Sequence, residues 1–274
     1  MIKVSGRPAI RQATLDVLGE SFVEVVGQYV LPIFIDIDGA PTSVGTGFLL
    51  HTGRDHVLIT AAHVLEGIGS GKSFYFYVAR SLKRTVAGLV LMAKLPPSGR
   101  REDDQIDVAA VLLEGDSDEL PPFPLVGKDS MPLEMVSAHA SPRSDKRYAF
   151  LGFPSSKATV NRVIKGVRSA SYAYLAATAP TSVYLTLRLE ETSHIVLPFA
   201  KRNVVTLEGA KYNFPRPKGM SGSPLWELRK PEDGGRKVVG VMIEHRKQEN
   251  VFLATDIGFV LRILSEHYRK RDLG

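Results

Sequence analysis

The stretch Gly-Met-Ser-Gly-Ser-Pro at residues 219–224 decides how this sequence is interpreted, because it is built like a loop that carries a nucleophilic serine. A serine hydroxyl is a poor nucleophile at neutral pH, and it needs a base to take its proton and N–H groups to hold the resulting oxyanion. Glycines on both sides of Ser221 allow a tight turn in which the amides of Gly219 and Ser221 point into one concavity. The same composition is also typical of a plain turn.

Two further stretches favour catalysis over a plain turn. Thr-Ala-Ala-His-Val at residues 60–64 ends an apolar run, so His63 lies where a buried strand gives way to a turn. Asp107 opens a hydrophobic strand, where an unpaired buried carboxylate would be costly. That position makes sense if Asp107 accepts a hydrogen bond from an imidazole and fixes its tautomer. The alternatives are a core histidine whose hydrogen bonds are satisfied and an aspartate at a strand edge.

In the chain order His63, Asp107, Ser221, the three stretches resemble the motifs of trypsin-like (chymotrypsin-fold) serine peptidases, and in particular disulfide-free bacterial members. The resemblance implies a serine endopeptidase in which His63 is the base, Asp107 orients it and Ser221 attacks the peptide carbonyl. It also implies that the backbone amides of Gly219 and Ser221 form the oxyanion hole. An acyl-enzyme intermediate follows, and no cofactor or metal is expected.

The resemblance covers roughly residues 23–270 and implies an all-β fold of two antiparallel six-stranded β-barrels with a C-terminal α-helix. The first barrel is expected at 23–135, with His63 and Asp107, and the second at 145–250, with Ser221. The C-terminal helix is expected at 255–270, and residues 1–22 are expected to form an N-terminal extension with a short helix over 9–20. Strands are predicted within 22–37 and at 45–50, 148–154 and 238–243, a hairpin turn at 51–56, and a further strand from the apolar alternation at 183–189.

Composition excludes some classes of function. The chain of 274 residues has no cysteine, which excludes thiol catalysis and a disulfide framework. The net charge of +6 comes from small scattered basic groups without interleaved aromatic residues, so a solvated surface is favoured over a nucleic-acid partner. We recognise no signal peptide or membrane span, which predicts a cytoplasmic protein without a membrane partner.

The resemblance also gives a candidate substrate-binding set for a protein or peptide substrate: Pro215, Lys218, Met242, Ile243 and Glu244. Pro215 stands where trypsin carries its pocket aspartate, and Met242 stands where Glu-specific relatives carry a histidine. Neither specificity is therefore predicted. Glu244 would attract a basic side chain and Lys218 an acidic one.

Regulation by N-terminal trimming is not expected, because Met220 replaces the acidic residue that pairs with a new N-terminus in the family. We expect packing or a regulatory protein partner to order the serine loop, with the oxyanion hole unformed in the isolated chain. A catalytically inert trypsin-like fold that acts as a protein-binding module remains the alternative, and a basic nucleic-acid scaffold a third.

Overall fold

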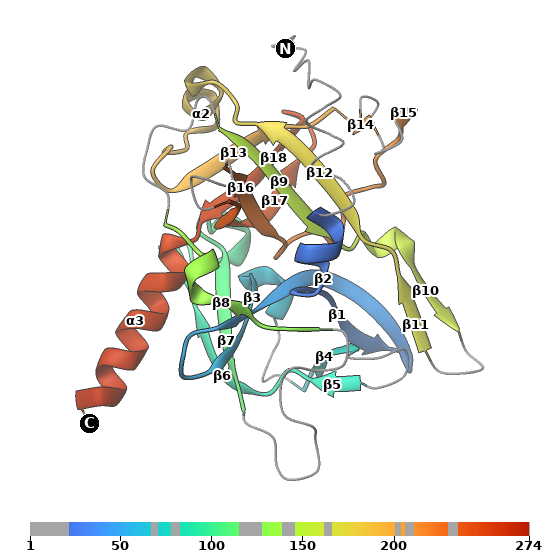
Figure 1. Cartoon of the computed structure of the whole chain (residues 1–274), viewed down its shortest axis with the longest axis vertical. Coiled ribbons are helices and arrows are strands. Elements are labelled where there is room, and N and C mark those ends of the chain that lie inside the picture. The colour runs from blue at the N-terminus through green and yellow to red at the C-terminus, as the bar shows by residue number, and fades with distance from the viewer. Residues whose placement is uncertain are drawn as a thin grey trace.

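The structure is a computed structural model that describes residues 22–66, 71–77, 83–114, 128–138, 146–161, 166–200, 204–205, 211–229 and 235–273. Two curled antiparallel sheets dominate it, and a long C-terminal helix runs along one side (Figure 1). The predicted all-β class is thereby confirmed.

The first sheet holds His63 and Asp107 at its strand ends. Its strand order is β5-β4-β1-β2-β3-β7-β6, and β8 pairs in parallel with β2. The described residues thus give it eight strands rather than six. They are β1 (Val30–Ile37), β2 (Ala40–His51), β3 (His56–Ala61), β4 (Phe74–Tyr77), β5 (Lys83–Thr85), β6 (Gly88–Met92), β7 (Val108–Leu113) and β8 (Met131–Pro132).

The second sheet has six strands in the order β12-β9-β16-β17-β18-β13. These are β9 (Arg147–Gly152), β12 (Tyr172–Ala177), β13 (His194–Pro198), β16 (Pro224–Leu228), β17 (Lys237–Arg246) and β18 (Val251–Asp256). Two short ribbons pair β10 (Ala158–Asn161) with β11 (Gly166–Ser169) and β14 (Val204–Val205) with β15 (Lys211–Tyr212). The 3-10 helices are η1 (Ala62–Leu65), η2 (Arg101–Asp103), η3 (Leu133–Met135) and η4 (Ser155–Lys157).

Several local predictions are confirmed. Residues 45–50 lie in β2, 238–243 in β17, and the larger part of 148–154 in β9. The turn between β2 and β3 pairs His51 with His56, as the predicted hairpin requires.

The run at 22–37, predicted to hold the first strands, forms a strand only in its second half. Residues 22–27 are helical, and β1 begins only at Val30. The buried ring of Phe22 meets Trp226 of the second sheet edge-on, at 6.4 Å between ring centroids. This helical segment therefore packs against the second half of the molecule. The helix expected over 9–20 lies outside the described residues.

Helix α2 (Thr181–Leu187) occupies the segment that was expected to form a strand at 183–189, so that prediction was wrong. Tyr184 and Leu187 are buried three residues apart, whereas Leu185 is 74% exposed. The two large buried side chains therefore follow helical spacing, which outweighs the alternating apolar pattern.

The C-terminal helix α3 (Gly258–Leu273) confirms the expected closing helix, although residues 255 and 256 still belong to β18. It leaves the second sheet and packs on the β2–β3 hairpin of the first, where Tyr268 Oη lies 2.9 Å from Thr52 Oγ1. Arg54 of the hairpin forms a 2.8 Å ion pair with Asp272. The helix thus joins the two sheets. Within the described ranges, no helix is long and apolar enough to span a membrane.

Candidate active site

His63 and Asp107 form a closely fitted pair. His63 lies in η1, directly after β3, and Asp107 directly precedes β7. These strands pair with Ala61 opposite Val108, which brings the two residues together. His63 Nδ1 lies 2.5 Å from Asp107 Oδ2, and the backbone N–H of His63 donates to Oδ1 at 2.8 Å. Because the carboxylate accepts at Nδ1, Nε2 is left as the acceptor of the neutral ring.

The pKa of His63 is raised above its usual value. Burial lowers the pKa, but the hydrogen bond and negative charge of Asp107 raise it by more, and Glu66 and Glu244 act in the same direction. The side chain remains 39% exposed. This arrangement gives an accessible imidazole whose protonated form is stabilised by a buried carboxylate.

Asp107 has an unusual backbone conformation. Its φ of 38° lies in the left-handed region, which aspartate tolerates better than most residues. Such a conformation costs on the order of 1–3 kcal/mol and persists only where surrounding contacts enforce it. Here the carbonyl of Asp107 accepts from the N–H of Ala62 at 3.0 Å, while its carboxylate is held by His63.

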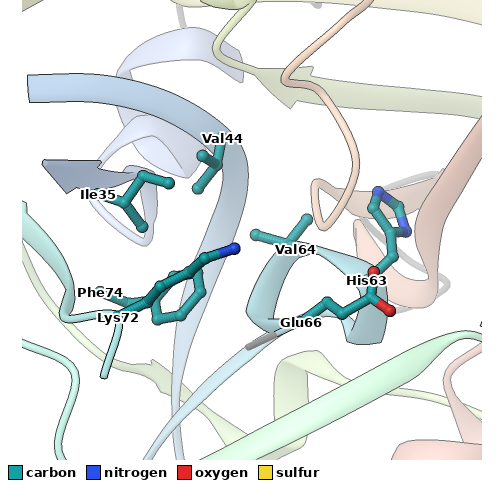
Figure 2. A pocket seen from close by; sticks show the side chains of 7 residues that line it. All are labelled: Ile35, Val44, His63, Val64, Glu66, Lys72 and Phe74. Atoms are coloured by element: carbon teal, nitrogen blue, oxygen red, sulfur yellow. The ribbon is translucent and has the colours of Figure 1, made fainter. Parts of the chain in front are cut away.

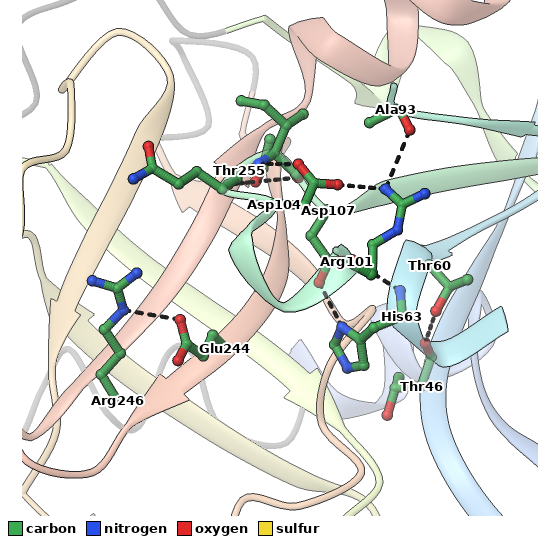
Figure 3. A network of polar contacts seen from close by, with 12 residues as sticks. Thr46, Thr60, His63, Ala93, Arg101, Asp104, Asp107, Glu244, Arg246 and Thr255 are labelled. Atoms are coloured by element: carbon green, nitrogen blue, oxygen red, sulfur yellow. Dashed lines mark hydrogen bonds and ion pairs between the residues drawn. The ribbon is translucent and has the colours of Figure 1, made fainter. Parts of the chain in front are cut away.

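The turn before Asp107 is held by the second half of the molecule. Thr255 of β18 donates its hydroxyl proton to the carbonyl of Ile106 at 2.7 Å, and the ring of His194 in β13 lies 2.9 Å from the carbonyl of Gln105. An ion pair between Arg101 and Asp104 closes the same turn (Figure 3). Residues from both halves thus position the acid.

The serine loop needs its glycines. Gly219 and Gly222 have φ of 95° and 92°. A Cβ on Gly222 would lie 1.9 Å from the carbonyl oxygen of Thr46, and one on Gly219 would lie 2.3 Å from Ser155 Oγ. The two positions flanking Met220 and Ser221 can therefore be occupied only by glycine without rearrangement.

Thr46 connects this loop to the strand that leads to His63. Its backbone N–H donates to the carbonyl of Ser221 at 2.8 Å, and its hydroxyl donates to the carbonyl of Gly219 at 2.8 Å. The carbonyl of Thr46 accepts from the hydroxyl of Thr60 at 2.7 Å (Figure 3). Both threonines are fully buried. Sequence reasoning missed them, although the flanking glycines of β2 are a sign of close backbone approach.

The orientation of the loop amides follows from the carbonyl contacts. The carbonyl of Lys218 accepts from the N–H of Ser155 at 2.8 Å, and that of Met220 accepts from the hydroxyl of Ser223 at 2.7 Å. In a trans peptide the next N–H points away from the carbonyl, so the N–H groups of Gly219 and Ser221 point away from these partners. Neither donates to a protein group among the described residues. They are thus available to an anionic ligand.

The hydroxyl of Ser221 forms no hydrogen bond with His63 in the part of the chain that the structure describes. Ser221 is half-buried, and the loop that carries it contacts the strand before His63 through Thr46 and Thr60. In enzymes without bound substrate, a hydrogen bond between nucleophile and base is often long and tightens only in the complex.

A very small cavity of about 10 Å³ lies beside Ser221. Of the expected substrate-binding residues, Met242 and Glu244 line it, whereas Pro215, Lys218 and Ile243 do not. Met242 and Ile243 are both buried but pack in different core clusters, at a point where the register of β17 against β18 shifts between Met242 and Glu244. The full lining of this small cavity is Pro217, Met220, Ser221, Met242, Glu244, His245 and Phe252.

A second, larger cavity of about 330 Å³ opens beside His63 (Figure 2). All of its lining residues come from the first half of the chain, and sequence reasoning missed it because no local motif marks it. They are Ile35, Val44, His63, Val64, Glu66, Lys72 and Phe74.

Comparison with known proteins identifies the fold. No family model matches the chain, and no curated protein sequence matches it either. Among solved structures, it is similar to neuropsin, a serine protease expressed in the limbic system of mouse brain. The TM-score is 0.53 at 14% identity, over 90% of this chain and 95% of that one. It also matches AL20, a thermostable serine protease from an extremophilic microorganism, with a TM-score of 0.48 at 14% identity, over 84% of this chain and 91% of that one.

The protein therefore has the trypsin-like fold, as its three motifs indicated. The chain order of His63, Asp107 and Ser221 and the two-sheet architecture agree with each other. At 14% identity, the likeness to neuropsin concerns the fold alone.

Proposed function

We propose that the protein is a serine endopeptidase that hydrolyses peptide bonds with Ser221, His63 and Asp107. One observation supports this above all others. The carboxylate of Asp107 holds both the ring and the backbone N–H of His63, at 2.5 and 2.8 Å. A carboxylate bound in this way fixes the orientation and the tautomer of an imidazole for proton transfer.

The proposed reaction begins when Ser221 Oγ attacks the peptide carbonyl while His63 Nε2 takes its proton. Asp107 stabilises the imidazolium, and the N–H groups of Gly219 and Ser221 bind the oxyanion. His63 then gives the proton to the leaving amine. Water attacks the acyl-enzyme with His63 again as base, which restores the serine.

The proposed substrate is a protein or peptide. Met242 and Glu244 are the proposed contacts for its acyl side, because both line the cavity that includes Ser221. Ile243 leaves this set, since it does not line that cavity. A regulatory protein partner remains part of the hypothesis.

A fluorophosphonate probe tests the assignment, because it reacts covalently only with an activated serine. We expect stoichiometric labelling of the purified protein at Ser221 and none in Ser221→Ala. Ser182→Ala, on the exposed side of α2, is the matched control and should label like the original protein.

Absence of labelling in the folded protein would favour the inert binding module. Labelling that persists in Ser221→Ala would place the nucleophile elsewhere. Cleavage of casein by the purified chain, lost in Ser221→Ala, would complete the assignment as a peptidase.

A further inference from the structure

The two cavities beside the proposed catalytic residues differ greatly in size. The one that includes Ser221 measures about 10 Å³, and the one that includes His63 measures about 330 Å³. The first is lined by residues between 217 and 252, the second by residues between 35 and 74. They therefore lie in different halves of the molecule.

The proposed mechanism assigns each cavity to one side of the bond that is cut. The acyl part of the substrate becomes bonded to Ser221, so its last side chain faces the small cavity. The leaving amine receives its proton from His63, so the residues that follow the bond lie on the histidine side. The large cavity is thus positioned for the leaving group.

The protein's own side chains fill the space beside Ser221. Met220, Met242 and Phe252 are each only 2% exposed. The ring of Phe252 packs against His245, with 5.2 Å between their centroids. About 10 Å³ is room for roughly one water molecule. A hydrogen atom or a methyl group fits there, but a larger side chain does not.

The cavity beside His63 has apolar walls. Ile35 of β1, Val44 of β2, Val64 of η1 and Phe74 of β4 face a common space, with His63 at one end (Figure 2). Its volume lies at the lower end of the range of ligand pockets. One large side chain would fill it.

The charges at this cavity oppose each other. Lys72 and Glu66 both line it, one positive and one negative. Glu66 lies beside His63, whereas Lys72 reaches into the space between Val44 and Val64, and four of the seven lining residues are apolar (Figure 2). A bulky uncharged side chain is the occupant that buries most apolar surface here.

We propose that the protein selects its cleavage site chiefly through the leaving-group side. It would accept a bulky apolar side chain within the first two residues after the bond, and only glycine or alanine immediately before it. This inference rests on the proposed peptidase function, and it names the substrate class of that same site.

A panel of quenched fluorescent peptides with constant flanks tests this directly on the unmodified protein. We expect peptides with alanine before the bond and phenylalanine after it to be cleaved fastest. Glycine in place of that phenylalanine should lower kcat/KM by at least about tenfold, as for other apolar pockets. Replacing the preceding alanine by phenylalanine should also lower it.

A preference for a bulky residue before the bond, or indifference to the residues after it, would overturn the inference. Labelling of Ser221 by fluorophosphonate separates this from failure of the proposed function, because the probe carries no residues on the leaving side. A protein that labels but shows no leaving-side preference is a serine hydrolase for which only this inference is wrong. A protein that does not label lacks the proposed function.

Val44→Phe provides a second test, because it fills the large cavity from a half-buried strand position. We expect the ratio of kcat/KM for the phenylalanine and glycine peptides to fall by about tenfold. Leu89→Phe adds the same ring on β6 at a site that is 49% exposed, and it should keep the ratio. Ile35→Trp fills the cavity from β1 in case Val44→Phe does not fold. An unchanged ratio in a folded filling variant would contradict the inference.

Discussion

The backbone N–H of Thr46 donates a 2.8 Å hydrogen bond to the carbonyl of Ser221, which joins the first sheet directly to the proposed nucleophile. The hydroxyl of Thr46 contacts the same loop at Gly219 and also accepts from the N–H of Phe153 at 3.0 Å. These contacts order the serine loop by packing within the chain. The sequence had left two possibilities for ordering this loop, packing or a regulatory protein partner. The contacts of Thr46 hold the loop carbonyls and leave the N–H groups of Gly219 and Ser221 without a partner among the described residues.

Thr46→Val tests this role, because valine keeps the shape and removes only the hydroxyl. The carbonyl of Gly219 and the N–H of Phe153 would then be buried without this partner, so we expect a loss of about 1–3 kcal/mol in the free energy of unfolding. Fluorophosphonate labelling should slow as well. Denaturant unfolding and labelling kinetics measure the two effects.

Thr42→Val is the matched control on the same strand, where the hydroxyl makes only a 3.5 Å contact at an exposed position. It should change neither quantity. If Thr46→Val also leaves both unchanged, the contact does not order the loop.

Gly222→Ala should lower the free energy of unfolding by more than the strain at its positive φ alone would. At φ 92° alanine is strained, and its Cβ would also meet the carbonyl of Thr46 at 1.9 Å. Gly53→Ala is matched, because its φ is 87° and nothing lies within 4 Å of the new Cβ. We expect a loss of about 1–2 kcal/mol at Gly53 and clearly more at Gly222, measured by denaturant unfolding. Equal losses would mean that the close approach to Thr46 carries no cost.

The isolated chain should label at Ser221 without any added protein, because the loop contacts lie within the chain itself. The sequence alone led us to expect an unformed oxyanion hole that waits for a partner or substrate, and that expectation is still to be tested. The measurement is the labelling rate of the purified protein with and without a peptide that carries only the residues after the bond and so leaves Ser221 free. A rate that is much higher in the presence of this peptide would support the expectation of an unformed hole.

Single substitutions of the three proposed catalytic residues should not add. His63→Ala, Asp107→Ala and Ser221→Ala should each abolish most activity, and the double and triple variants should be barely worse than the worst single one. Peptide hydrolysis measured with high enzyme concentrations resolves the residual rates. Additive losses would show that the three residues do not act as a unit.

Sequence motifs predicted the parts of the site that depend on local structure. His63 follows β3 and Asp107 precedes β7 as expected, and pairing of these strands then brings them together. The tight turn at the glycines of the serine loop was likewise expected, because the ability to adopt a positive φ depends on the type of the single residue. Both predictions rest on short sequence motifs that contain the proposed catalytic residues themselves.

Long-range packing explains what the sequence did not reveal. Thr46 meets a loop 173 positions away, and the large cavity draws on four separate elements. The local pattern also gave a wrong prediction at residues 183–189, which is compatible with either a strand or a helix. These residues alternate in polarity like a strand, but the packing of Tyr184 selects a helix. Which residues of β17 line the small cavity depends on the register shift between Met242 and Glu244, and Met242 lines the cavity whereas Ile243 does not.

The raised pKa of His63 predicts how stability depends on pH. A group whose pKa is higher in the folded state stabilises that state fully below its unfolded value of about 6.5. This contribution is lost as the pH rises through the higher folded value. Asp107→Asn removes the charge that raises the pKa, so the stability difference between the two proteins should shrink as the pH rises through this range. Urea unfolding at several pH values measures it, and a constant difference would contradict the proposed electrostatic coupling.

The activity should also depend on the interaction between Asp107 and His63, but it should increase with pH where the stability contribution decreases. The reason is that His63 must be neutral to accept the proton of Ser221. We expect kcat/KM to rise with pH, with a midpoint above 6.5, and to reach a plateau on the alkaline side, since Asp107 raises the pKa of the imidazole. In Asp107→Asn the midpoint should move to lower pH, and kcat near neutrality should fall strongly, because an amide can stabilise the wrong tautomer of His63. Asp103→Asn, at an exposed position paired with Arg100, is the matched control and should change neither value. If Asp107→Asn keeps the original rate and pH profile, Asp107 only supports the turn before β7, and another acid must orient His63.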